Sequence, residues 1–121
     1  MGRHGLAASA KLYWRRLHER LYERRLGIRS REIIYLRNLG LERQDRREHY
    51  PTALDDFRRM EKFLWPRADD EVFLDYGAGL GRVLILAAML PFKRVIGVEL
   101  SPILAAKACD NLSNANARLS L

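Results

Sequence analysis

Residues 72–99 constrain the fold more than any other stretch of the chain. They read VFLDYGAGLGRVLILAAMLPFKRVIGVE: an apolar run, a glycine-rich turn, a helical run, a second apolar run and a carboxylate. Two short β-patterned segments, residues 72–75 and 94–99, flank a helical pattern of about one average helix length. This order predicts a βαβ unit, and its crossover makes the two strands parallel.

The turn after the first predicted strand carries three glycines at alternate positions, Gly77, Gly79 and Gly81. Glycine adopts positive φ and has no Cβ, so such a turn can be tight and can let a ligand lie against bare backbone. Glu99 ends the second strand, and an acid about 20 residues beyond a glycine turn hydrogen-bonds ribose hydroxyls in doubly wound folds. The stretch therefore predicts a site for a nucleoside cofactor.

The glycine spacing separates two interpretations of the cofactor. A dinucleotide fingerprint, G-x-G-x-x-G, would place its third glycine at position 82, where the chain has Arg82. This disfavours NAD. The observed pattern is D-x-G-x-G-x-G followed by a strand ending in Glu, and it resembles the first two motifs of the class I S-adenosylmethionine-dependent methyltransferases.

The wider runs LDYGAGLGRVLILAA and RVIGVELSPIL look most like a bacterial branch distantly similar to the non-SET histone-lysine methyltransferases. The resemblance covers roughly the last 70 residues and implies an α/β, Rossmann-like methyltransferase fold. Since the family sheet has seven strands and only two are convincing here, we expect a fold truncated after its first βαβα unit. Residues 1–49 would form a basic, mainly helical N-terminal extension, and residues 50–121 the N-terminal portion of the methyltransferase domain.

The resemblance implies S-adenosyl-L-methionine as cofactor and assigns roles to the residues around the turn. Glu99 would bind the ribose, Asp75 the ammonium group, and the N-terminus of the following helix the methionine carboxylate. Leu100 and Ser101 would line the adenine. The candidate cofactor-binding residues are Tyr50, Thr52, Asp75, Tyr76, Gly77, Ala78, Gly79, Gly81, Glu99, Leu100 and Ser101.

Tyr50 and Thr52 enter that set by resemblance to a Tyr-Pro element near the methionine end of the family pocket. A purely structural interpretation is also open. Pro51 holds Tyr50 out of helical geometry, and Thr52 with Asp55 approximates a capping box for a helix through Leu64.

Two further residues have alternative interpretations. Asp75 is either a cofactor ligand or an acid that bonds its own turn. Arg82 is either a snorkelling surface residue or a partner of Asp75 or of the cofactor carboxylate. Beyond Glu99, Ser101 as cap and Pro102 predict a further helix that ends at residues 114–116.

The net charge of +7 comes from the first part of the chain, since residues 1–49 hold 13 basic and 6 acidic side chains. Apolar residues at three- and four-residue spacing predict an amphipathic helix over residues 6–26, which Gly27 ends. We expect its apolar stripe, which includes Tyr13 and Trp14, to pack against the rest of the chain. A membrane surface or a nucleic acid is the alternative, although no nucleic-acid motif accompanies it.

The single cysteine, Cys109, excludes an intrachain disulfide and a cysteine zinc cluster, and we expect it to be buried. No metal site is predicted. No apolar run reaches the roughly 18 residues of a membrane span, so a cytoplasmic location is expected.

The leading functional prediction is methyl transfer to an unidentified acceptor, either a protein or a small molecule; nucleic acid is possible but unsupported by a motif. No catalytic residue is named, because the family's acceptor-positioning residues are expected beyond residue 121. An NAD-type oxidoreductase fragment and a non-catalytic basic binding protein are the alternatives.

Overall fold

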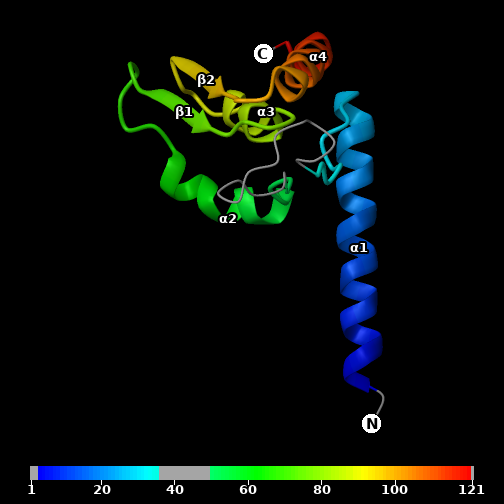
Figure 1. Cartoon of the computed structure of the whole chain (residues 1–121). Coiled ribbons are helices and arrows are strands. Elements are labelled where there is room, and N and C mark those ends of the chain that lie inside the picture. Colours follow the sequence, from blue (N-terminus) through cyan, green and yellow to red (C-terminus); the bar gives the residue numbers. More distant parts are fainter. Residues whose placement is uncertain (1–2, 36–49, 121) are drawn as a thin grey trace.

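The computed structural model describes residues 3–35 and 50–120, with the side chains of the latter segment and of residues 8–35. The chain is broadly α/β, with helices and a small parallel sheet (Figure 1). The elements in chain order are α1 (Arg3–Leu26), α2 (Leu54–Leu64), β1 (Val72–Tyr76), α3 (Arg82–Ala88), β2 (Arg94–Val98) and α4 (Pro102–Leu119).

The predicted βαβ unit is confirmed. β1 and β2 pair in parallel, from Val72 opposite Arg94 to Tyr76 opposite Val98, and α3 connects them. Gly97 lets α3 approach β2 closely, because a Cβ built there would lie 2.4 Å from Cδ1 of Leu84. The two strands therefore end side by side, next to the glycine turn and the start of α4.

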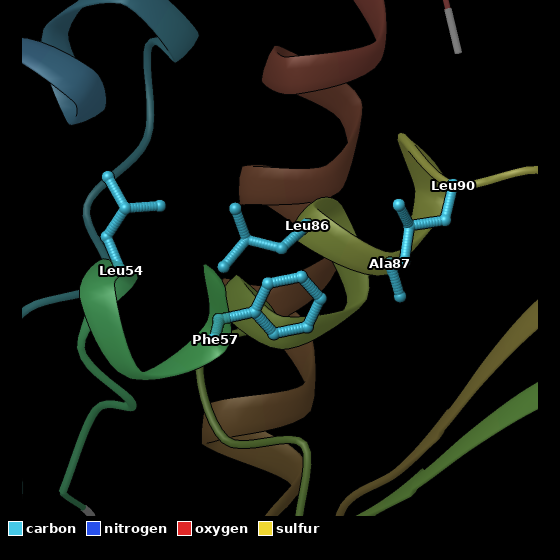
Figure 2. Close-up of a cluster of buried hydrophobic side chains, with 5 residues drawn as sticks. All are labelled: Leu54, Phe57, Leu86, Ala87 and Leu90. Atoms are coloured by element: carbon cyan, nitrogen blue, oxygen red, sulfur yellow. The ribbon is translucent and has the colours of Figure 1, made fainter. Parts of the chain in front are cut away.

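The main apolar core lies between α2, α3 and one face of the sheet. Leu54 and Phe57 of α2 pack against the α3 side of the unit, and Phe73 and Val95 close the cluster from the strands. Figure 2 shows the buried side chains of this cluster: Leu54, Phe57, Leu86, Ala87 and Leu90. The core fixes α3, and with it the glycine turn that precedes α3.

A second apolar cluster joins the end of α1 to α3 and α4 through Leu26, Ile28, Ile85 and Ala115. The predicted stop of α1 at Gly27 is confirmed. Gly27 has φ +68°, its N–H donates to the Arg24 carbonyl, and the Ile28 N–H donates to the Glu23 carbonyl. These two bonds form a Schellman motif, which ends the helix and redirects the chain.

The expected packing of the α1 stripe is wrong. Tyr13 and Trp14 are 64% and 65% exposed, and Leu21 is 54% exposed. The side of α1 that faces the body instead buries Glu19 and Glu23. In Figure 1 the N-terminal part of α1 stands away from the rest of the chain. The predicted amphipathic pattern is wrong as well, because the apolar side chains of α1 are spread around the helix, so their spacing could not indicate which side is docked.

Three smaller expectations also need correction. Cys109 is exposed, not buried. α4 continues through residues 114–116 to Leu119, because Ala115 is buried in the second cluster. Ala53, not Thr52, is the N-cap of α2 and makes no side-chain cap; the N–H of Leu54 donates to Oε1 of Glu19 at 2.8 Å.

The apolar run at residues 33–36 predicts a short strand or bridge, and the described part of this run contains a single bridge residue, Ile34. The charged residues 43–48 predict an exposed loop or a frayed helical turn; they and Leu36 lie outside the described residues.

Candidate functional site

The glycine turn between β1 and α3 adopts a conformation that other residues strongly disfavour. Gly77, Gly79 and Gly81 have φ values of 81°, 54° and 80°, all in the left-handed region. The N–H groups of Gly77 and Ala78 both donate to the Val98 carbonyl, at 2.7 and 3.0 Å. The turn is therefore tied to the carboxyl end of β2.

Glu99 holds the same turn from the other side. Its Oε2 accepts a hydrogen bond from the N–H of Gly79, and its Oε1 accepts one from the N–H of Ser101, both at 2.8 Å. The carboxylate thus bridges the glycine turn and the start of α4. Since a carboxylate has about four lone-pair positions, acceptor capacity remains for a ligand hydroxyl.

A small cavity lies at the carboxyl end of β1, beside the turn. It gathers five of the predicted cofactor-binding residues, which come from two distant parts of the chain: Tyr50, Thr52, Asp75, Gly77 and Ala78. A Cβ built on Gly77 would meet no atom within 4 Å, so the backbone there is open to a ligand.

Asp75 lines this cavity, and its carboxylate is available to bind a ligand. Burial, and then the neighbouring Glu99 carboxylate, raises the pKa of Asp75 above its usual value. Within residues 3–35 and 50–120 no hydrogen bond or ion pair engages its oxygens. A half-buried carboxylate in that condition favours a cationic ligand group, which would lower the cost of its charge.

Arg82, which also lines the cavity, is bound mainly by side chains from elsewhere in the chain. It is only 5% exposed, and its guanidinium forms ion pairs with Glu19 and with Glu23, the latter at 3.0 Å. It also donates to Oγ of Ser30 at 2.8 Å and to the Thr52 carbonyl at 3.3 Å. The interpretations of Arg82 as a surface residue and as a partner of Asp75 are therefore wrong, whereas its pairing with the cofactor carboxylate stays a prediction.

Glu23 completes this buried network. Its carboxylate accepts from the N–H and the hydroxyl of Ser30 and from Nε of Arg31, at 2.7, 3.0 and 2.9 Å. Burial by itself raises the pKa of Glu23, but these hydrogen bonds and the charge of Arg82 outweigh it, so the pKa lies below its usual value. This network, which we call the Arg82 network, joins α1, residues 30–31 and the start of α2 to Arg82, the first residue of α3.

The other predicted site residues lie outside the small cavity. Tyr76 and Leu100 are 76% and 65% exposed near the strand ends. Gly81 is packed against α4, since a Cβ built on it would lie 3.2 Å from the Cβ of Ala108. Ser101 is buried, and its hydroxyl accepts from the N–H of Leu104, which confirms the predicted cap of α4.

The sequence reasoning missed Glu19, Glu23 and Ser30. A signal for the two acids existed, because they are the only carboxylates in residues 1–31 and stand four residues apart within a basic helix. Residues at that spacing share one helix face. An isolated acidic face in such a helix indicates a buried cationic partner, here 63 residues away along the chain.

Comparison of the chain with protein-family models, with curated proteins and with solved structures finds no match. The described helices include none long and apolar enough to cross a membrane. Within the described residues, no group of three or more His, Cys, Asp or Glu side chains is arranged to hold a metal ion.

Proposed function

We propose that the chain is the cofactor-binding part of an S-adenosylmethionine-dependent methyltransferase with a Rossmann-like fold. The observation that carries the proposal is the cavity at the carboxyl end of β1, where Asp75 meets the open backbone of Gly77 and the Tyr50–Thr52 segment. In open α/β sheets, ligands bind outside the carboxyl ends of the strands, which is where this cavity lies.

The size and charge of the cavity favour the amino-acid end of the cofactor. The cavity volume is about 80 Å³, much smaller than the roughly 300 Å³ or more of a pocket that takes a whole ligand. Its free carboxylate, Asp75, suits the ammonium group. The nucleoside would then run over Gly77 toward Glu99, where no Cβ blocks it.

Glu99 would bind the ribose hydroxyls through the lone pairs that the N–H groups of Gly79 and Ser101 leave free. These two N–H bonds fix the carboxylate before a ligand arrives, so little ordering is needed on binding. Thr52 and Tyr50 would contact the methionine end from the opposite wall of the cavity.

The cofactor, when bound, would supply a sulfonium methyl group for transfer to a nucleophilic atom of the acceptor, with the carbon–sulfur electron pair left on sulfur. The contribution of these residues is positioning, which for such an in-line transfer is the main part of catalysis. Asp75, Gly77 and Glu99 would hold the donor.

Calorimetric titration of the chain with S-adenosylhomocysteine tests the proposal. We expect saturable binding that Asp75→Asn weakens about tenfold or more, because a charge-assisted hydrogen bond is lost. The matched control is Asp70→Asn, on the exposed link before β1, which should bind as the unmodified chain does. Since burial disfavours the charged form of Asp75, the Asn variant should keep its thermal stability at pH 7.

A parallel titration with NADH separates the oxidoreductase alternative. Binding of NADH without binding of S-adenosylhomocysteine would refute the methyltransferase proposal. Equal loss of affinity in both Asp variants would show that Asp75 has no special role in the site.

A further inference from the structure

A second, larger groove adjoins the cofactor cavity. It lies between α1 and the segment that enters α2, and its volume is about 390 Å³. Tyr50, Pro51 and Arg82 line both hollows, so the two are neighbours. We call it the basic groove; the lining residues that matter below are Leu12, Arg15, Arg16, Arg31, Ile33 and Tyr50.

Among the described residues, the basic groove carries more positive than negative charge. Arg82 and Arg31 are matched by Glu19 and Glu23, which leaves Arg15 and Arg16. Both are exposed, and neither forms an ion pair within the described chain. The one acid among the described lining residues, Glu19, is already bound to Arg82 and to the N–H of Leu54. The groove therefore attracts an anion.

The same sign of charge continues along α1. The exposed Lys, Arg, Asp and Glu side chains among residues 8–26 are all basic: Lys11, Arg15, Arg16, Arg20, Arg24 and Arg25. The two acids of the helix, Glu19 and Glu23, are buried. A repeated anion would find positive charge both inside the groove and along the helix that forms its wall.

We infer that the basic groove binds a nucleic acid strand, which would be the acceptor presented to the cofactor cavity. Arg15 and Arg16 would bind successive phosphates, and the exposed ring of Tyr50, between the two hollows, would face a base. The acceptor role rests on the proposed function; the binding itself does not.

Two observations favour a strand over a membrane surface. The positive side chains that matter line a concave groove, which a flat bilayer cannot enter. Arginines also stand on several sides of α1, with Arg15, Arg20 and Arg25 on different faces, whereas a helix that lies on a membrane segregates charge to one side.

Fluorescence anisotropy of labelled 12-nucleotide strands, RNA and DNA separately, tests the inference with the full chain. We expect binding at 50 mM salt whose affinity falls linearly with salt on a logarithmic scale. Each phosphate contact contributes a slope of about 0.7 for single strands, so Arg15→Ala with Arg16→Ala should reduce the slope by about 1.4. It should also weaken binding about fivefold or more at 50 mM salt.

The matched control is Arg58→Ala with Arg59→Ala, an adjacent pair of exposed arginines on α2 that lines neither hollow. This variant has the same net charge as the groove variant and should bind like the unmodified chain. Equal weakening by both pairs, or no binding at low salt, would overturn the inference.

Other anions serve as competitors. Polyglutamate that competes as well as the oligonucleotide, or phosphatidylserine vesicles that bind while strands do not, would also overturn it. A mononucleotide that competes equally would reduce the ligand to a free nucleotide and so contradict a strand. S-adenosylhomocysteine titrated into the same samples separates the two proposals: if it binds while strands do not, only the groove inference fails.

Discussion

Arg82 determines how the N-terminal helix and the glycine turn are joined. It is the first residue of α3, yet its guanidinium is bonded to residues that precede α2. A buried ion pair contributes little net stability compared with an apolar pair, but removal of one partner leaves the other charge buried. Glu19 therefore depends on this one cation, whereas Glu23 pairs with both Arg82 and Arg31.

We predict that Arg82→Leu destabilises the fold by about 3 kcal/mol or more, because Glu19 and Glu23 lose their shared cation. Urea unfolding at pH 7 measures the change. Arg59→Leu is the control: Arg59 is 77% exposed and 3.8 Å from Asp56, so its loss should change stability by no more than about 0.5 kcal/mol. A loss below about 1 kcal/mol in Arg82→Leu would mean that the network is not formed in solution.

Glu23 predicts how stability depends on pH. Its pKa in the fold lies below the ordinary value of 4.5, so the unfolded chain binds the proton more tightly. The stabilisation is thus complete above about pH 4.5 and disappears as the pH falls through the folded-state pKa. Glu23→Gln should flatten this acid limb in unfolding curves between pH 3 and 6, whereas Glu32→Gln, on an exposed pair with Lys107, should not. Identical acid limbs in all three proteins would contradict the assignment.

Two glycines of the turn, Gly77 and Gly81, have different structural roles. All three glycines of the turn have positive φ, but Gly77 faces open space and Gly81 faces Ala108 of α4. The turn is further held by Glu99 and by the carbonyl of Val98. One glycine therefore leaves room for a ligand, while another allows two helices to approach.

We predict different effects of alanine at these two positions. Gly81→Ala adds a steric overlap with Ala108 to the cost of a left-handed backbone, so it should be more destabilising than Gly77→Ala, which adds only the backbone cost of about 1–2 kcal/mol. Gly77→Ala should lose more affinity for S-adenosylhomocysteine relative to its loss of stability. Thermal melts and calorimetry on both variants measure this, and the reverse order for either quantity would count against the open site at Gly77.

At the scale of elements, the sequence was sufficient where the determinants are local. The two apolar runs, the glycines and Ser101-Pro102 lie within or next to the elements they specify, so the βαβ unit and the start of α4 followed from them. The end of α4 did not, because Asn114 and Asn116 look like a stop while Ala115 is held by contacts with distant residues. A buried contact outweighs weak local propensities.

At the scale of the whole molecule, the described residues form a body of packed elements from which the N-terminal part of α1 projects (Figure 1). Among the described side chains of α1, those that join the apolar clusters, Tyr22 and Leu26, and those that join the ion-pair network, Glu19 and Glu23, belong to the last turns of the helix. The earlier part of the helix carries exposed side chains, Tyr13 and Trp14 among them. The two parts of one helix should therefore contribute very differently to stability.

We predict that removal of residues 1–10 leaves the melting temperature within about 2 °C, because the described side chains lost with them, residues 8–10, are exposed. Removal of residues 1–26 should abolish cooperative unfolding, since it removes Leu26 from the second cluster and leaves Arg82 without either carboxylate. Circular dichroism melts distinguish the two cases. A cooperative melt in the longer deletion would show that the body folds without α1.

The candidate site could be predicted only in part, because some of its residues lie far apart in the sequence. The turn residues and Glu99 could be located from spacing, and the Tyr50–Thr52 segment from resemblance alone. The Arg82 network could not be predicted. The carboxylates that pair with Arg82 lie 63 and 59 positions earlier in the sequence, and no local pattern specifies their pairing with Arg82. The basic groove, which α1 and the start of α2 form together, was hidden for the same reason.

The Arg82 network also restricts which amino-acid substitutions the chain can accept during evolution. A change of Glu19 or Glu23 to an uncharged residue would leave a surplus cation beside the cavity, and loss of Arg82 would leave surplus anions within α1. Among sequences related to this chain, positions 19, 23 and 82 should therefore vary together: an apolar residue at 82 should coincide with uncharged residues at 19 and 23. Substitutions in α1 and at the first residue after the glycine turn would then be correlated among homologous sequences.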